Sequence, residues 1–321
     1  MRDKRSGRPF EWLSRSLDRR EFLKYQVKGA LFLVAGSSGL IVPGTGLAAG
    51  VPDIAVVKGP PGSATRAAVE LMGGMGSFVK QGNRVVIKPN MSFPNPPEMA
   101  STTHPEVIRE LSVMCKEAGA SRILIADYPL SLTRDCLKRT GIRDACKDID
   151  DTTVVGASSG RLYLETDFPG AEIMPENGVL KEVLKADVLI AAPVAKSHTA
   201  TGVSLSMKGM MGLVWDRQSM HTLGLASSIV DMCAILKADL TVIDGTRVLS
   251  TRGPRGPGKV LKEDTVIVSK DMVAADAYAV SLFSWYGRKY KPRQVQHIRQ
   301  AHKRGLGRMD IENLNVKKLV L

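Results

Sequence analysis

The feature that most constrains the fold is a series of short apolar runs, rich in valine and isoleucine, with helix-like segments between many of them. The runs cover residues 53–57, 84–87, 122–126, 152–155, 188–192, 240–243 and 265–268. Their hydrophobicity is continuous rather than alternating, which is typical of strands covered on both faces. The helix-like segments cover residues 64–80, 104–118, 223–237, 272–286 and 293–303. We therefore predict an α/β protein: a doubly wound, mainly parallel sheet with helices on both faces.

The pattern changes between residues 150 and 176. Short strand-like pieces at residues 161–165 and 171–174 replace the longer runs there, which predicts a small inserted β subdomain. The rest of residues 50–321 is long enough to bury one large core or two modest ones, and we expect a single α/β domain. Thr103 and Glu106 have capping-box spacing, which predicts that a helix begins at residue 104.

Residues 1–49 have the layout of a secretory signal: a basic zone, an apolar zone and a small-residue zone that ends in Ala48-Ala49. Within the basic zone, Arg19-Arg20 is followed by Phe22-Leu23-Lys24, which resembles the twin-arginine consensus except at Asp18, where Ser or Thr is usual. The apolar zone is shorter than the roughly twenty residues that a transmembrane helix needs. We therefore expect the twin-arginine translocase to export the folded chain to the periplasm or otherwise outside the cytoplasmic membrane, without a stable membrane span. Retention of the apolar zone as a membrane anchor is the second alternative.

The net charge favours anionic partners. Residues 1–49 carry nine Lys or Arg and four Asp or Glu, so about +8 of the formal +13 remains without them. Such a surplus is typical of proteins that bind small anions or anionic headgroups, and it also promotes solubility. Nucleic acid is not expected as a partner, because aromatic residues make up only 5% of the chain and no arginine-rich or stacking motif is present.

The four cysteines form no C-x-x-C pair and have no zinc-like spacing. Cys115 and Cys233 follow apolar residues at helical spacing, which places them on core-facing helix sides. Cys136 and Cys146 are a candidate disulfide outside the cytoplasm, although folding before export weighs against it.

Polar side chains follow five of the apolar runs, close to where each strand is expected to end. Because ligands of open α/β sheets bind beyond the carboxyl ends of the strands, these side chains are candidates for one shared site. Ordinary loop polarity is the alternative interpretation. The groups are Lys88-Pro89-Asn90, Asp127-Tyr128-Pro129, Lys196-Ser197-His198-Thr199, Asp244-Gly245 and Ser269-Lys270-Asp271.

The densest group lies between residues 188 and 214. Two lysines and one imidazole among small residues predict an anion and proton-transfer site, so Lys196, His198 and Lys208 are the candidate catalytic residues. The glycine-rich stretch 251–259 is a candidate lid or an ordinary surface loop, and it lacks the order of a phosphate-binding Walker motif. The candidate substrate-binding residues are Lys88, Asn90, Thr199 and Arg255, and the candidate metal ligands are Asp127 and Asp244.

These motifs, together with Thr103-His104-Pro105, Lys208-Gly209-Met210-Met211-Gly212 and Asp276-Ala277, resemble the family called domain of unknown function 362. The resemblance spans nearly all of residues 53–285. Relatives usually show Lys-Asn-Leu-Phe-Gly where this chain has Lys208 to Gly212, which removes one amide side chain. Many relatives add ferredoxin-like cysteine clusters. No such motif occurs in this chain, so the resemblance does not imply an iron–sulfur cluster.

Two functions fit these residues. The first is an exported enzyme that acts on a small anionic substrate, in which Lys88, Lys196 and Lys208 hold the anion and His198 moves a proton. In that case the two aspartates orient the lysines or bind a divalent cation. The second is a metal-binding or cofactor-binding maturation protein for an exported redox partner, although no metal-ligand spacing supports it.

Overall fold

The computed structural model describes residues 50–321, and the predicted twin-arginine signal lies outside them. A mixed sheet forms the centre of the molecule, and strands β8 (Val194–His198) and β9 (Gly202–Val203) extend from it. The strands along the sheet are, in order, β12 (Val316–Val320), β1 (Ile54–Lys58), β11 (Val260–Ser269), β10 (Leu240–Leu249), β7 (Val188–Ala192), β2 (Arg84–Pro89), β3 (Arg122–Asp127) and β4 (Thr152–Gly156).

Neighbouring strands from β10 through β7, β2 and β3 to β4 are parallel, which confirms the predicted mainly parallel sheet. Strand β11 is the exception, because it runs antiparallel to both β1 and β10. It follows β10 through the glycine-rich stretch 251–259, which reverses the chain direction as a long hairpin loop. The edge strand β12, which pairs in parallel with β1, was not predicted.

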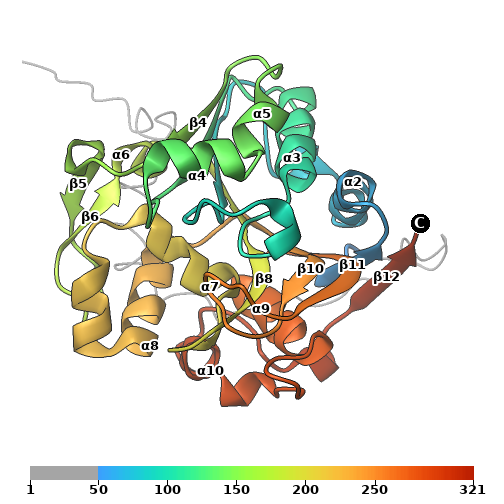
Figure 1. The fold of residues 1–321 in the computed structure, drawn as a ribbon. Helices are drawn as coiled ribbons and strands as arrows, with labels where there is room; N and C mark the ends of the chain where they lie inside the picture. The colour runs from blue at the N-terminus through green and yellow to red at the C-terminus, as the bar shows by residue number, and fades with distance from the viewer. Residues whose placement is uncertain (1–49) are drawn as a thin grey trace, which may run out of the picture.

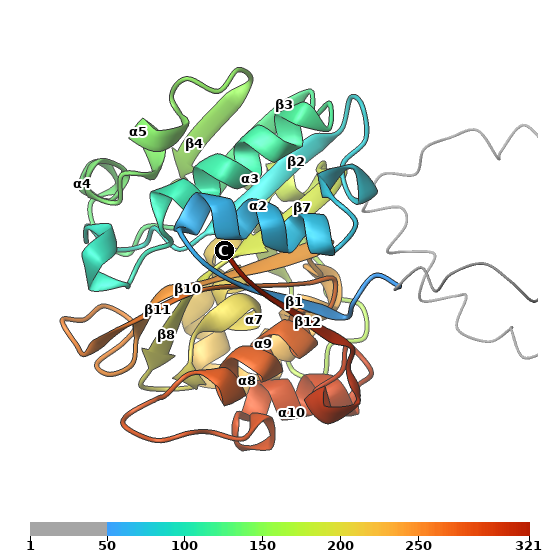
Figure 2. The same ribbon diagram turned by 90° about the vertical axis from the view of Figure 1, so that its right-hand side faces the viewer.

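Helices cover both faces of the sheet, as Figures 1 and 2 show. One face carries α2 (Pro61–Leu71), α3 (Pro105–Glu117), α4 (Thr133–Arg139) and α5 (Ile142–Cys146). The other carries α6 (Lys181–Leu184), α7 (Leu205–Gly209), α8 (Arg217–Ile235), α9 (Met272–Leu282) and α10 (Gln296–Lys303). Successive strand residues point to opposite faces, so Val85 and Ile87 belong to one core and Val86 to the other. The doubly wound fold is thereby confirmed.

Shorter elements connect these layers. Strands β5 (Tyr163–Thr166) and β6 (Asn177–Leu180) form a separate two-stranded sheet between β4 and β7 in the chain. This sheet corresponds to the small inserted β subdomain that the sequence predicts. Short 3₁₀ helices are η2 (Met75–Ser77), η3 (Pro97–Met99), η4 (Gly160–Leu162), η5 (Met210–Leu213), η6 (Pro292–Gln294) and η7 (Ile311–Asn313).

Three local predictions are wrong. Residues 171–174 form no strand, because the backbone N–H groups of Ile173 and Met174 donate to the buried carboxylate of Asp231 instead of to a neighbouring strand. Helix α3 is capped by His104, whose Nδ1 accepts from the Glu106 N–H, so no capping box forms there. Helix α8 begins earlier than residue 223, at Arg217, and bends at Gly224.

All four cysteines are buried free thiols, so the hypothesised disulfide between Cys136 and Cys146 is not formed. Cys115 belongs to the core between the sheet and α3, and Cys233 belongs to the opposite core, as expected. Within residues 50–321, no helix has both the length and the apolar character needed to cross a bilayer.

Candidate functional site

Strand β8 continues the chain beyond β7 after a break at Pro193, and it brings the candidate residues together. It pairs with β10 and with the short strand β9, so Lys196 and His198 lie in a buried strand and not in the loop that the sequence predicts. The side chain of Asn90, just past β2, fixes the start of β8, because its Oδ1 accepts from the Val194 N–H at 3.0 Å.

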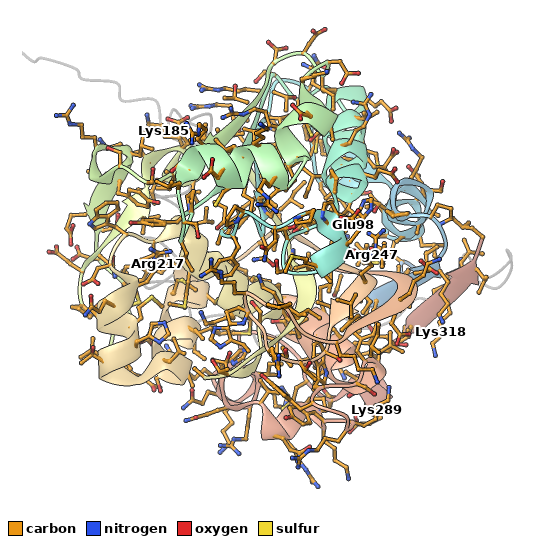
Figure 3. The ribbon with its side chains drawn as sticks, viewed as in Figure 1. Glu98, Lys185, Arg217, Arg247, Lys289 and Lys318 are labelled. Atoms are coloured by element: carbon orange, nitrogen blue, oxygen red, sulfur yellow. The ribbon has the colours of Figure 1, made fainter. Side chains whose placement is uncertain are left out.

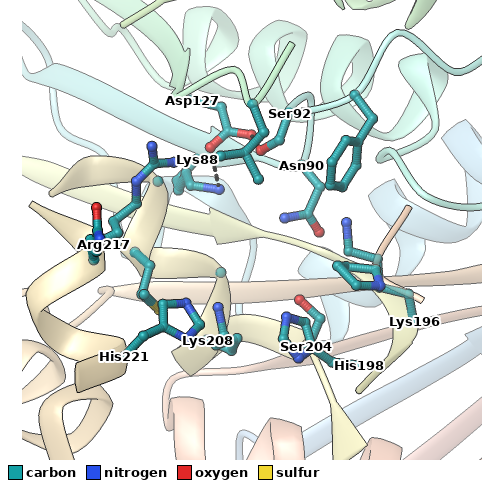
Figure 4. Close-up of a pocket in the computed structure, with 17 residues that line it drawn as sticks. Lys88, Asn90, Ser92, Asp127, Lys196, His198, Ser204, Lys208, Arg217 and His221 are labelled. Carbon is teal, nitrogen blue, oxygen red and sulfur yellow. Dashed lines mark hydrogen bonds and ion pairs between the residues drawn. The ribbon is translucent and has the colours of Figure 1, made fainter. Parts of the chain in front are cut away.

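A cavity of about 410 Å³ opens at this carboxyl edge of the sheet. Six of the nine candidate residues line it, namely Lys88, Asn90, Asp127, Lys196, His198 and Lys208. In Figure 4, Lys88, Asp127 and Asn90 lie on one side of the cavity, and Lys208 and His198 lie across it. Segments far apart in the sequence, from Lys88 to Pro254, therefore meet in one concave site at the strand ends.

Lys88 and Asp127 form a buried ion pair at the back of the cavity. The Lys88 Nζ lies 3.0 Å from Asp127 Oδ1, and the two side chains are only 2% and 1% exposed. The carboxylate also accepts from the N–H groups of Met91 and Tyr128 and from the Ser92 hydroxyl. Its two oxygens are thus occupied by hydrogen-bond donors from the loops after β2 and β3, and the charge of Lys88 is largely compensated.

Gly212 allows the chain to pass directly over this pair. A Cβ at position 212 would lie 1.9 Å from Asp127 Oδ1 and 2.6 Å from Lys88 Cε. No side chain fits at such distances without breaking the ion pair. Gly212, the last residue of the Lys208 to Gly212 motif, is therefore required because the backbone passes so close to the ion pair. Its backbone conformation is not the reason, since its φ is not in the left-handed region.

Lys196 has a different environment, because among residues 50–321 no carboxylate lies within ion-pair distance of it. Its Nζ donates to the Ser101 carbonyl at 2.6 Å and lies 5.6 Å from the centre of the Phe93 ring. Burial, opposed by Asp127 and reinforced by Lys88 and Lys208, lowers the pKa of Lys196 to about 7. This amine changes its protonation state in the neutral pH range.

Lys208 and Arg217 face the same cavity from the helical side. Burial and the charges of Arg217 and Lys88 lower the pKa of Lys208 to about 8. The Arg217 guanidinium lies 3.5 Å from the centre of the Tyr128 ring, and its Nε is buried without a hydrogen-bond partner in the described chain. Tyr128 in turn packs against Trp215. Within residues 50–321, no carboxylate forms an ion pair with Lys208 or Arg217, so the cavity contains cationic groups without a partner of opposite charge in this part of the chain.

The neighbouring cations keep His198 uncharged. Burial first, and then Lys208 and Lys196, lower the pKa of His198 to about 3. Its Nδ1 accepts a hydrogen bond from the Ala200 N–H at 3.1 Å, so the proton of the neutral ring lies on Nε2. With its pKa this low the ring stays neutral near pH 7, and it acts as a hydrogen-bond donor through Nε2. Lys196 is the group with a pKa suited to proton transfer.

The depressed lysine pKa values predict how stability depends on pH. An unfolded lysine titrates near 10.4, so between about pH 7 and pH 10 the unfolded chain binds more protons than the folded chain. The free energy of unfolding, measured with urea without ligand, should therefore rise over this range. Lys196→Met should flatten the rise and be more stable than the parent at pH 7, by up to a few kcal/mol. Lower stability of Lys196→Met than of the parent at every pH would contradict the prediction. The control is Lys318→Met, because Lys318 is exposed and its removal should leave the pH dependence of stability unchanged.

Three candidate residues lie outside the cavity. Asp244 is buried, and its carboxylate accepts from the His104 N–H and from both the N–H and the hydroxyl of Thr246, so it holds two loops together. Thr199 is exposed in the turn between β8 and β9, and Arg255 is also exposed.

The glycine-rich stretch 251–259 contributes a fixed wall through Pro254. The Gly253 N–H donates to Ser197 Oγ, and the Arg255 carbonyl accepts from Asn95. A Cβ at Gly253 would lie 1.9 Å from the Ser197 carbonyl oxygen, so this loop packs directly on β8. These contacts do not support the hypothesis that the loop is a mobile lid.

Sequence reasoning missed Arg217 and His221, which line the cavity from the first turns of α8. A usable signal was present in Asp216, whose carboxylate caps the helix by accepting from the Ser219 N–H. Asp276 was also missed as a positioning residue. Its buried carboxylate accepts from the N–H groups of Ser206 and Met207, and so fixes the start of α7, the helix that carries Lys208.

Comparisons with known proteins find a sequence relative and solved structures of limited similarity. A thylakoid-associated protein of Synechocystis sp. is 26% identical over 219 residues, which are 66% of each chain. Among solved structures, the lactate racemase apoprotein of Thermoanaerobacterium thermosaccharolyticum has a TM-score of 0.43 and 14% identity over 68% of this chain and 54% of its own. A Thermotoga maritima protein has a TM-score of 0.35 and 11% identity over 69% and 59%. This chain thus spans about two thirds of the relative and little more than half of each structure. The domain of unknown function DUF362 matches residues 85–281, and the chain belongs to that family.

Proposed function

We propose that this protein is an enzyme that binds a small anionic substrate in the cavity and transfers a proton through Lys196. The observation that carries the proposal is the buried Lys196 amine beside other cations, with no carboxylate within ion-pair distance in the described chain. Burying cations without partners is costly, and natural proteins retain such arrangements chiefly at functional sites.

The charge balance of the cavity favours an anion. Asp127 already compensates Lys88, which leaves Lys208 and Arg217 as the cations for the negative group of the substrate. Arginine on an aromatic ring is a rigid donor for a carboxylate or a phosphoryl group. A cavity of about 410 Å³ lies within the range of about 300 to 1,000 Å³ that is typical of small-molecule sites.

The neutral form of Lys196 can accept a proton from a C–H or O–H group of the bound substrate. The bonding electrons then remain on the substrate as developing negative charge, and the ammonium returns the proton later in the cycle. Two neutral donors face the same cavity, namely His198 Nε2–H and the Asn90 amide nitrogen, whose Oδ1 is engaged with the Val194 N–H. They supply the hydrogen bonds that stabilise such charge.

A divalent cation fits these residues poorly. The Asp127 oxygens already accept from three donors besides Lys88, and Asp244 lies outside the cavity. Within residues 50–321, no group of His, Cys, Asp and Glu side chains has the arrangement of a metal site. These side chains therefore give less support to the hypothesis of a metal-binding or cofactor-binding maturation protein. Stoichiometric metal in protein purified from its native host would restore it.

A ligand screen tests the anion proposal. Thermal stability of the full chain is measured against small carboxylates and phosphate esters at pH 7, and at least one anion should raise the melting temperature. Lys208→Met should weaken this response at least tenfold, while Lys318→Met should leave it unchanged. Figure 3 shows Lys318 on the edge strand, far from Arg217. An equal response of both variants to every ligand would reject the cavity as the anion site.

We also propose that the protein works outside the cytoplasmic membrane, delivered by the twin-arginine translocase. The support is Arg19-Arg20 with Phe22-Leu23-Lys24 at the required spacing. Replacing both arginines by lysine should leave the precursor in the cytoplasm when the host is fractionated. Normal export of that variant would rule out the twin-arginine route.

A further inference from the structure

The lining of the cavity is apolar where the loops after β2 and β3 meet. Phe93 belongs to the first of these loops and Leu130 to the second, and both line the cavity. The Leu130 N–H donates to the Ser92 carbonyl at 2.8 Å, so the backbone of Leu130 is joined to the residue that precedes Phe93. The two loops therefore present both apolar side chains from the same part of the wall.

The polar groups of this wall are already engaged within the protein. The Ser92 hydroxyl donates to Asp127 Oδ2 at 2.8 Å, and the Ser92 carbonyl accepts from the Leu130 N–H and from the Cys136 thiol. Among residues 50–321, Asp127 is the only carboxylate that lines the cavity, and Lys88 already neutralises its charge. A ligand therefore meets mainly apolar surface where the two loops join.

The cations belong to a different part of the lining. Lys208 comes from α7, and Arg217 comes from the first turn of α8. Figure 4 shows Asp127 on one side of the cavity and Lys208 across from it. A carboxylate or phosphoryl group bound to Lys208 and Arg217 fills only a small part of a cavity of about 410 Å³. The space toward Phe93 and Leu130 is left for the rest of the ligand.

Leu130 exposes apolar surface at this place although its backbone is fixed. Its side chain is 56% exposed, whereas that of Phe93 is 7% exposed. Single exposed leucines are common on protein surfaces, but this one lines the same cavity as the buried Phe93. An apolar group that extends from the cavity past Leu130 removes this surface from water, which stabilises the complex in proportion to the area covered.

We propose that the substrate is an amphipathic anion, whose charged group binds Lys208 and Arg217 and whose aliphatic chain lies against Phe93 and Leu130. Leu130 is then a specificity-determining residue, because it contacts the part of the chain that leaves the cavity. This inference rests on the proposed function, since it uses the same anion site, and it adds the chemical class of the other half of the substrate.

Two homologous series of probes test the apolar half. Linear carboxylates from acetate to octanoate, and linear alkyl phosphates of matching length, are titrated calorimetrically into the full chain at pH 7. Affinity should rise by up to about fourfold for each methylene group that becomes buried, and should level off once the chain has passed Leu130. The series that binds more tightly at equal chain length identifies the charged group.

Leu130→Asn replaces the leucine by a polar side chain of similar size. It should remove most of the rise in affinity with chain length and leave the affinity for the shortest members unchanged. The variant should fold, because the side chain that it replaces is more than half exposed. Leu132→Asn is the matched control, since Leu132 is 70% exposed, lies two positions away and does not line the cavity. The control should keep the parent affinity at every chain length.

Lys208→Met separates this inference from the proposed function. It should weaken the binding of every member by the same factor and leave the rise with chain length unchanged. Long members that bind no better than short ones, or that do not bind at all, would overturn the inference. Equal effects of Leu130→Asn and Leu132→Asn would overturn it as well. If the rise with chain length persists but Lys208→Met changes no affinity, the proposed anion site is rejected instead.

Discussion

Lys196→Arg should abolish turnover of the substrate found by the ligand screen while retaining much of the anion binding. Arginine keeps the positive charge but stays protonated at all accessible pH values, so it cannot accept a proton. Loss of a positioned general base commonly costs a factor of about a hundred or more in rate. Lys196→Met should lose the same rate and, in addition, some affinity. Parent kcat should rise with pH through about 7, as the Lys196 amine is deprotonated.

The control for this prediction is a lysine that lines no part of the cavity. Lys318→Met should keep the parent kcat and the parent pH profile. Because arginine is larger than lysine and the site is buried, thermal unfolding must first show that Lys196→Arg is folded. A folded Lys196→Arg variant with more than a tenth of the parent turnover would exclude Lys196 as the base, and would direct attention to Lys208.

Gly212→Ala should destabilise the protein by about 3 to 5 kcal/mol, the cost typical of breaking a buried ion pair. The added methyl group would overlap Asp127 Oδ1, so either the pair separates or η5 moves away from the sheet. Urea denaturation at pH 7 measures the change. Gly76→Ala is the matched control, because a Cβ there meets nothing within 4 Å and the substitution should stay within about 0.5 kcal/mol of the parent.

The same substitution distinguishes a structural from a positioning role. If the ion pair positions the cavity wall, Gly212→Ala should also lower the affinity for the anion at temperatures where the variant is fully folded. A variant as stable as the parent would show that the backbone at position 212 relaxes easily, and that close approach to the ion pair does not require a glycine at this position.

The position of the site at the carboxyl edge of the sheet was predictable from the sequence. Continuous apolar runs identify parallel strands, and parallel strands end on the same side of the sheet. Lys88, Asp127 and Lys196 meet for this reason. The direction of each side chain was not predictable, since residues along a strand alternate between faces, and Asp244 points to the start of α3 instead of into the cavity. The sequence also did not indicate that Pro193 is followed by a further strand, because Lys196 and His198 are polar residues in a buried position.

Arg217 and His221 escaped prediction for another reason. The bend at Gly224 interrupts the helical periodicity of α8, so the apolar pattern becomes clear only after residue 223. The sequence also does not show which of Lys196 and His198 has the pKa closer to neutrality. Isolated histidine titrates near neutrality and isolated lysine does not, but burial among cations lowers the pKa values of both. As a result His198 stays neutral near pH 7, whereas Lys196 changes its protonation state there.

The free thiols bear on where this protein can be assembled. All four cysteines lie within the described residues and are buried in the core without being joined, so the tertiary structure depends on no oxidising step. Burial also raises the pKa of Cys146 to about 11 and that of Cys115 to about 12, which keeps both protonated and slow to react. As far as its cysteines are concerned, the same fold can therefore form in a reducing compartment and persist in an oxidising one without disulfide formation or exchange.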